Sequence, residues 1–196
     1  MSELNETEEN NQLIIVNKGA GAGGTNTNKN GLSYEEITDL KDRFKSCDFN
    51  KYDDICEIVF EGYERTFIKA NKSALHKYMN KNGEKKTDLQ PAAGCKQPDE
   101  AYIDKDNNIV FIIEKKFQQG SGSVDEKIQT GPFKKIHYQE LFPNFKIYYI
   151  YCLSDWFKRD EYKSVLNYLR QNDIPIFWGS SETYKQDIIE MINSSL

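Results

Sequence analysis

An apolar run, Ile109 to Ile113, carries no polar residue at alternate positions. A run of this kind without alternation is typical of a β-strand that is covered on both faces. The turn-forming residues 105–108 precede it, and a further apolar segment lies before them. We therefore expect a hairpin over 97–117. A strand covered on both faces needs helices on both sides of its sheet, so this run favours a layered α/β fold.

Charged residues lie at the strand ends of this hairpin, on the side away from its turn. If Asp106-Asn107 form the centre of a two-residue turn, Asp99 lies directly opposite Glu114. Cross-strand neighbours have Cβ atoms roughly 4.5–5.5 Å apart. Side chains alternate along a strand, which puts Lys116 on the face of Glu114 and points Lys115 the other way. A register error of one residue would separate this group.

Two carboxylates at this separation suit an oxygen-preferring cation. Mg²⁺ typically takes one or two carboxylates and keeps several waters. Lys116 could then lie beside a metal-bound water. Without a metal, Asp99 and Glu114 repel each other, so one of them should have a raised pKa. The alternative is that these charges are the solvated rim of the sheet.

The rest of the chain alternates between helical and strand patterns. Residues 1–12 are predicted to be a disordered acidic leader, and 13–196 a single domain with a polar loop over 17–31. Pro132 should kink or split its helix. The element order predicts an α/β sandwich, whose mixed central sheet is antiparallel at first and later parallel through right-handed crossovers. Helices are expected over 33–46, 73–80, 124–140, 160–171 and 180–192, and strands over 55–60, 63–69, 146–152 and 174–178.

Pro98-Asp99 followed by Glu114-Lys115-Lys116 resembles the signature of the PD-(D/E)xK nuclease superfamily. The segments 23–35 and 117–130 resemble type II restriction endonucleases within that superfamily. The resemblance covers roughly residues 19–155 and implies a restriction-endonuclease-like sandwich. It also implies a sequence-specific, Mg²⁺-dependent endonuclease of duplex DNA, with Mn²⁺ as a substitute. Such an enzyme leaves 5′-phosphate and 3′-hydroxyl ends and acts in host defence against foreign DNA.

The resemblance assigns roles to particular residues. Asp99, Glu114, Lys116 and Glu35 would be catalytic, and Asp99, Glu114 and the backbone carbonyl of Lys115 would bind the metal. Glu35 is the best match to a glutamate of the first helix; it could equally be a solvated first-turn acid favoured by the helix dipole. The candidates for contact with DNA are polar or basic: Asn26, Asn28, Lys29, Gln118, Gln119, Lys127, Gln129, Thr130, Lys134, Lys158 and Arg159.

The implied partners are double-stranded DNA, a second copy of the chain in a homodimer on a two-fold symmetric site, and, functionally, a cognate DNA methyltransferase. Two other functions stay open. One is a structure-specific or repair nuclease on the same fold. The other is a catalytically silent DNA-binding module.

The formal net charge of −5 argues against nucleic acid at first sight, because a basic balance is the usual footprint of such proteins. However, the acidic leader contributes charge far from the motif, and the segment 115–170 is locally basic. No apolar run approaches the roughly 20 residues that span a bilayer. The N-terminus is acidic and shows no signal peptide. We expect a cytoplasmic protein without a membrane partner.

Overall fold

The computed structural model describes residues 25–47, 55–120 and 124–195, and the side chains from residue 30 onward within those ranges. The predicted leader 1–12 lies outside the described residues. No helix within the described ranges is long and apolar enough to cross a membrane.

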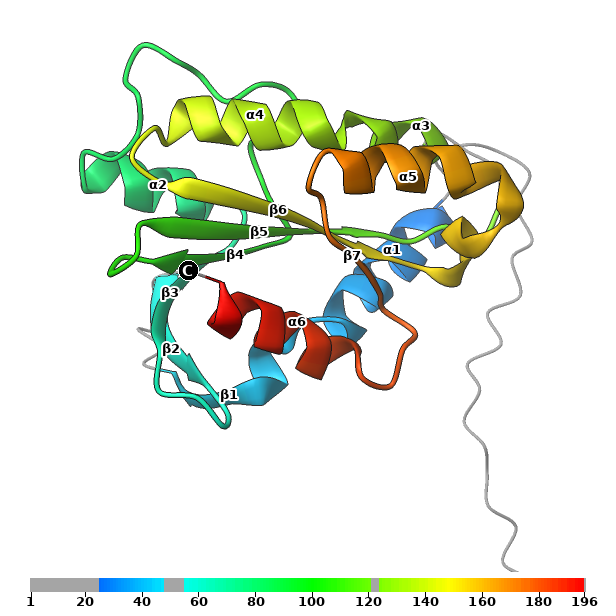
Figure 1. Ribbon diagram of the computed structural model, residues 1–196, viewed down its shortest axis with the longest axis horizontal. Helices are drawn as coiled ribbons and strands as arrows, with labels where there is room; N and C mark the ends of the chain where they lie inside the picture. Colours follow the sequence, from blue (N-terminus) through cyan, green and yellow to red (C-terminus); the bar gives the residue numbers. More distant parts are fainter. Residues whose placement is uncertain (1–24, 48–54, 121–123, 196) are drawn as a thin grey trace, which may run out of the picture.

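A seven-stranded mixed sheet forms the centre of the fold, with its strands in chain order (Figure 1). Neighbouring strands from β1 to β5 run antiparallel, and β5, β6 and β7 run parallel. This confirms the predicted mixed sheet. The strands are β1 (Phe44–Cys47), β2 (Ile55–Phe60), β3 (Thr66–Ala70), β4 (Glu100–Asp104), β5 (Ile109–Lys116), β6 (Lys146–Leu153) and β7 (Ile176–Trp178).

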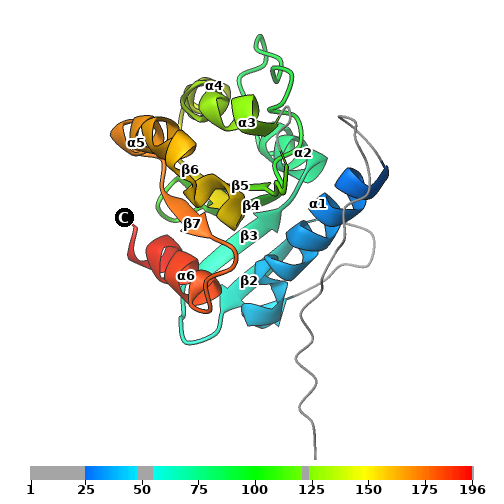
Figure 2. The same ribbon diagram turned by 90° about the vertical axis from the view of Figure 1, so that its right-hand side faces the viewer.

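Helices cover both faces of the sheet, as the apolar run required (Figures 1 and 2). On one face, α2 (Ser73–Lys81), α4 (Gly131–Leu141) and α5 (Lys163–Gln171) pack over one buried cluster. On the other face, α1 (Thr25–Ile37) and α6 (Tyr184–Ser194) pack over a second cluster. Side chains at Ile109 to Ile113 alternate between the two clusters, and all five residues are buried.

The central hairpin has the predicted register. Glu100 pairs with Ile113, and the ladder continues to Asp104 and Ile109. The turn differs: it has four residues, 105–108, and among them only Asn108 has a positive φ, of 52°. The Asp104 carboxylate accepts hydrogen bonds from the backbone and side-chain amides of Asn107, at 3.1 and 2.9 Å, and these bonds stabilise the longer turn.

The N-terminal helix exists, but its predicted bounds of 33–46 were wrong. Residues 25–37 form α1, so the predicted loop 17–31 becomes helical from Thr25, and Ser33 lies inside the helix instead of capping it. Residues 40–43, predicted as helix, form a short 3₁₀ turn, and β1 follows. Pairing of β1 with β2 overrides the local helical signal there.

Pro132 does split its helix, as predicted. A short α3 (Val124–Lys127) and a 3₁₀ turn over 128–130 come first, and α4 then begins at Gly131 with the proline in its first turn. Proline is tolerated there because the first helical amides have no partner inside the helix.

Candidate active site

Three charged residues lie together at the end of the central hairpin that is away from its turn: Asp99, Glu114 and Lys116. Lys116 Nζ is 2.7 Å from Glu114 Oε1 and 3.7 Å from Asp99 Oδ2. Asp99 Oδ2 also accepts a hydrogen bond from the Lys115 backbone amide at 2.7 Å, which fixes its direction. The side chains of Asp99 and Glu114 are only 17% and 9% exposed, so this is not a solvated rim.

A second ammonium group reaches the same carboxylate. Lys134 Nζ, from α4, lies 2.8 Å from Glu114 Oε1. The sequence interpretation had Lys134 among the DNA contacts; in the structure it is buried against the Glu114 carboxylate. A signal was present, because Lys134 stands four and seven residues before the buried Tyr138 and Leu141 and so shares their helix face.

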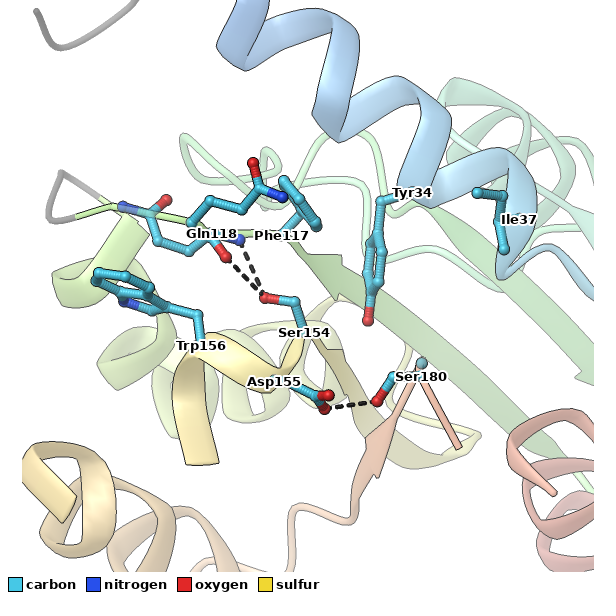
Figure 3. Close-up of a pocket in the computed structure, with 10 residues that line it drawn as sticks. Tyr34, Ile37, Phe117, Gln118, Ser154, Asp155, Trp156 and Ser180 are labelled. Atoms are coloured by element: carbon cyan, nitrogen blue, oxygen red, sulfur yellow. Dashed lines mark hydrogen bonds between the residues drawn. The ribbon is translucent and has the colours of Figure 1, made fainter. Parts of the chain in front are cut away.

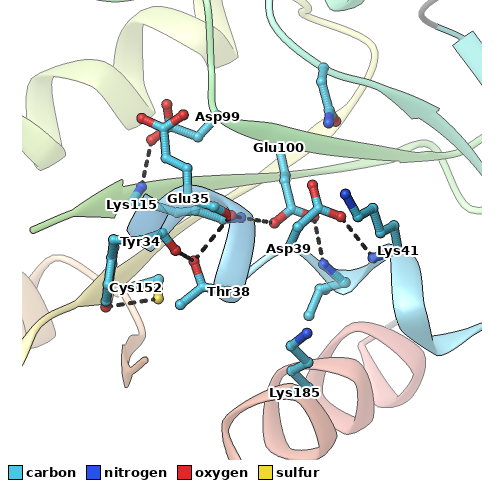
Figure 4. Close-up of polar contacts among 12 residues, drawn as sticks. Tyr34, Glu35, Thr38, Asp39, Lys41, Asp99, Glu100, Lys115, Cys152 and Lys185 are labelled. Carbon is cyan, nitrogen blue, oxygen red and sulfur yellow. Dashed lines mark hydrogen bonds and ion pairs between the residues drawn. The ribbon is translucent and has the colours of Figure 1, made fainter. Parts of the chain in front are cut away.

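Glu35 also faces this cluster. Its charge acts on both Asp99 and Lys116, raising the pKa of each, and Figure 4 shows its carboxylate directed toward that of Asp99. The residue lies in the last turn of α1. An acid there is disfavoured by the helix dipole, so the interpretation as a first-turn acid does not apply.

The two carboxylates titrate differently. Burial raises the pKa of Asp99 to about 6; Lys116 opposes this effect and Glu114 adds to it. Burial also acts to raise the pKa of Glu114, but the ammonium groups of Lys116 and Lys134 outweigh it and hold that pKa below its ordinary value. The predicted raised pKa therefore belongs to Asp99, with burial as its main cause and repulsion as a lesser one.

The pKa of Lys116 is raised in the metal-free site. Burial acts to lower its pKa, but Glu114 and Asp99 together raise it above the ordinary value. Its Nζ also donates a hydrogen bond to the backbone carbonyl of Lys115 at 3.0 Å. That carbonyl, predicted as a metal ligand, therefore faces the same space as the carboxylates.

A buried ion pair lies behind this cluster, on the opposite face of the sheet (Figure 4). Lys115 Nζ is 2.5 Å from Glu100 Oε1 and donates to the Glu35 carbonyl at 2.8 Å. Glu100 Oε2 accepts from the Tyr102 hydroxyl at 2.5 Å and from the Leu40 amide at 3.4 Å. These contacts join the end of α1 to the central hairpin and so hold Glu35 in place. The sequence interpretation did not include Glu100, although alternation along the strand places its side chain on the other face of the sheet from that of Asp99.

The remaining predicted DNA contacts are dispersed. Gln118 is buried, and its side-chain amide donates to the Gly120 carbonyl. Lys158 Nζ lies 2.6 Å from Asp155 Oδ1, and Arg159 Nη2 lies 2.7 Å from Glu161 Oε1. Gln119, Lys127, Gln129 and Thr130 are exposed on the surface. The side chains of Asn26, Asn28 and Lys29 lie outside what the structure describes.

The cluster offers oxygen donors of the kind that Mg²⁺ binds: two carboxylates and the Lys115 carbonyl. In the described parts of the chain, no group of three or more histidine, cysteine, aspartate or glutamate side chains is close enough to form a metal site by itself. A bound cation would thus have to displace the lysine ammonium groups from Glu114 and keep several waters.

Comparison of the chain with protein-family models, with curated proteins and with solved structures finds no match.

Proposed function

We propose that this chain is a Mg²⁺-dependent endonuclease with a restriction-endonuclease-like sandwich, hydrolysing phosphodiester bonds of duplex DNA. The observation that carries the proposal is the meeting of Asp99, Glu114 and Lys116 at one end of the central hairpin of a mixed sheet. This is the arrangement that the resemblance of the sequence to PD-(D/E)xK nucleases implies. The buried carboxylate pair supports it, because solvated rim charges would not need such pairing.

The residues present fit a divalent cation held by Asp99, Glu114 and the Lys115 carbonyl. Such a cation lowers the pKa of a bound water and offsets negative charge on the phosphate. Lys116 would orient the attacking water or help to deprotonate it, and would stabilise the negative charge that develops on the phosphate; in the metal-free site Glu114 and Asp99 raise its pKa. Attack of water on phosphorus with departure of the 3′ oxygen leaves a 5′-phosphate and a 3′-hydroxyl.

The sequence resemblance extends the proposal to restriction of foreign DNA. A homodimer acting on a two-fold symmetric site and a cognate methyltransferase that protects host DNA would accompany this function. Mn²⁺ is expected to replace Mg²⁺. The cytoplasm would be the place of action.

The fragment pattern tests this proposal. Purified protein is incubated with unmethylated phage DNA and Mg²⁺, beside an Asp99→Ala variant prepared in the same way. Discrete fragments that the variant does not produce would support a sequence-specific endonuclease, and sequencing of the ends would give the site. A smear dependent on Asp99 would indicate a structure-specific or repair nuclease. Intact DNA with both proteins and with either Mg²⁺ or Mn²⁺ would contradict the proposal.

A further inference from the structure

A cavity of about 450 Å³ opens beside the candidate active site, where β5, β6 and β7 end (Figure 3). Three of the ten residues that line it are aromatic. Tyr34 from α1 and Phe117 after β5 form one side, with ring centroids 5.3 Å apart. Trp156, after β6, stands on another side, and Ser154 lies between Trp156 and Tyr34. The volume is in the range of pockets that hold a small ring compound.

The cavity and the carboxylate cluster are built on the same two segments. Phe117 directly follows Lys116, and Tyr34 directly precedes Glu35, whose charge acts on Asp99 and Lys116. The Lys115 ammonium, which donates to the Glu35 carbonyl at 2.8 Å, fixes α1 against β5 at this point. A molecule bound in the cavity would therefore have its neighbouring groups within reach of the cluster.

The polar groups deep in the cavity are paired within the protein. Ser154 Oγ accepts from the Gln118 amide at 3.1 Å and donates to the Gln118 carbonyl at 3.2 Å. The Tyr34 hydroxyl lies 3.3 Å from Cys152 Sγ. This pairing leaves the ring faces as the main surface for a ligand. At the opening, the exposed Gln119 supplies a donor and an acceptor for the edge of a ring, while the Ser180 hydroxyl donates to the Asp155 carboxylate at 2.5 Å.

Positive charge lies next to the aromatic wall. The Arg159 guanidinium is 4.3 Å from the centre of the Trp156 ring, and it also pairs with Glu161 at 2.7 Å. Lys158 Nζ lies 5.2 Å from the centre of the Trp178 ring and pairs with Asp155 at 2.6 Å. An aromatic surface flanked by cations is the combination with which proteins bind unpaired nucleotides, stacking the base and attracting the phosphate.

We propose that this cavity binds one unpaired nucleobase of the DNA strand that occupies the carboxylate cluster. The inference rests on the proposed nuclease function and names the form of its substrate. Stacking of a base on an aromatic side chain contributes about 1–3 kcal/mol and tolerates any base, since every base has a π face. The base would come from a nucleotide extruded from the duplex or from a strand that is already unpaired.

Tryptophan fluorescence tests the proposal directly, because the chain has two tryptophans and only Trp156 lines the cavity. In a Trp178→Phe variant, Trp156 is the sole reporter. The variant is titrated, in buffer with EDTA to prevent cleavage, with a 5′-labelled thymidine oligonucleotide and with an oligonucleotide of equal length made of abasic residues. Binding is followed by anisotropy of the label. We expect saturable quenching of Trp156 by the first oligonucleotide and none by the second.

Two duplexes distinguish the sources of the base. One is fully paired and the other carries a single unpaired thymidine. Quenching by both indicates extrusion from the duplex, and quenching by the second alone indicates a base that was unpaired beforehand; both support the cavity as the base site. Binding without quenching, or equal quenching by the abasic oligonucleotide, overturns the cavity proposal alone. Failure of every DNA to bind overturns this proposal and the nuclease function together.

Matched variants give a second measurement. Trp156→Ala should weaken binding of the thymidine oligonucleotide by roughly 5- to 150-fold, the effect of losing one stacked base. Tyr168→Ala removes an exposed aromatic residue of α5 that is outside the cavity, and it should leave binding unchanged. Equal effects of the two substitutions would contradict the proposal. Circular dichroism spectra of both variants would show that each is folded.

Discussion

At the scale of single residues, the candidate active site is a balance between two carboxylates and two ammonium groups. The Nζ atoms of Lys116 and Lys134 lie 2.7 and 2.8 Å from Glu114 Oε1. The Oδ2 atom of Asp99 is 3.7 Å from Lys116 Nζ. This unequal sharing explains why the pKa of Glu114 is lowered while burial raises that of Asp99. The metal-free site therefore holds one carboxylate that titrates close to neutral pH.

The first prediction concerns this titration. Carboxyl ¹³C NMR of the metal-free protein should show Asp99 with a pKa of about 6. Because the Lys116 charge lowers that pKa, Lys116→Met should raise it further. The folded protein holds this proton more tightly than the unfolded chain, so the contribution of Asp99 to the free energy of unfolding should fall as pH rises from about 4 to about 6; the difference between the wild type and Asp99→Asn isolates that contribution. An Asp99 midpoint below 4, or no response to Lys116→Met, would contradict this account.

The second prediction concerns Lys134. Its ammonium lowers the pKa of Glu114, so Lys134→Met should raise that pKa, measurable in the same NMR titration. Protons would then compete with the metal at Glu114 up to a higher pH. We expect cleavage to decline more at pH 6 than at pH 8.5. Lys163→Met, which removes an exposed lysine of α5 paired with Asp160, is the matched control. An equal loss of activity at both pH values would argue for a purely structural role of Lys134.

At the scale of secondary-structure elements, α1 depends on the sheet for its position. Its last turn receives the Lys115 ammonium at the Glu35 carbonyl, where a positive charge complements the helix dipole. Tyr34 packs on Phe117 in the same region. The predicted helix 33–46 includes this last turn, but the start of α1 at Thr25 was not predicted, because its first residues are rich in Asn and follow a glycine-rich stretch, a composition that favours a loop.

The third prediction tests this anchor. Lys115→Met leaves the fully buried Glu100 without its ion partner, so it should lower the free energy of unfolding by about 3–5 kcal/mol. Urea denaturation measures the loss. Adding Glu100→Gln removes the uncompensated charge and should restore part of the stability. A double variant that is less stable than Lys115→Met alone would show that the pair does not act as described.

The hairpin illustrates what local sequence can predict. Its register was predicted by placing the centre of the turn at Asp106-Asn107, and the observed turn 105–108 has the same centre, so the strand pairing is unchanged. The turn length did not follow, because the Asp104 carboxylate, a side chain of the preceding strand, stabilises a four-residue connection. Asp99, Glu114 and Lys116 were found because they belong to one hairpin. Lys134 and Glu100 were assigned only by the structure, because their partners come from other elements or from the opposite face.

At the scale of the whole molecule, the fold places the carboxylate cluster and the aromatic cavity at the same end of the sheet. Open sheets with parallel strands commonly bind ligands at the carboxyl ends of those strands, where β5, β6 and β7 end here. Lysines and an arginine adjoin both features, and each of them is paired with a carboxylate in the structure.

The central claim is that Asp99 and its partners hydrolyse DNA. The most direct test compares initial rates of Mg²⁺-dependent phage-DNA cleavage by the wild-type protein, Asp99→Asn and Glu57→Gln. The Glu57→Gln variant neutralises an exposed acid on β2 as a matched control. We expect Asp99→Asn to lose cleavage by about 10²-fold or more, as is typical when one electrostatic group of an active site is removed, while DNA binding in a gel-shift assay persists and Glu57→Gln cleaves normally. Cleavage by Asp99→Asn at the wild-type rate would contradict the assignment of this site.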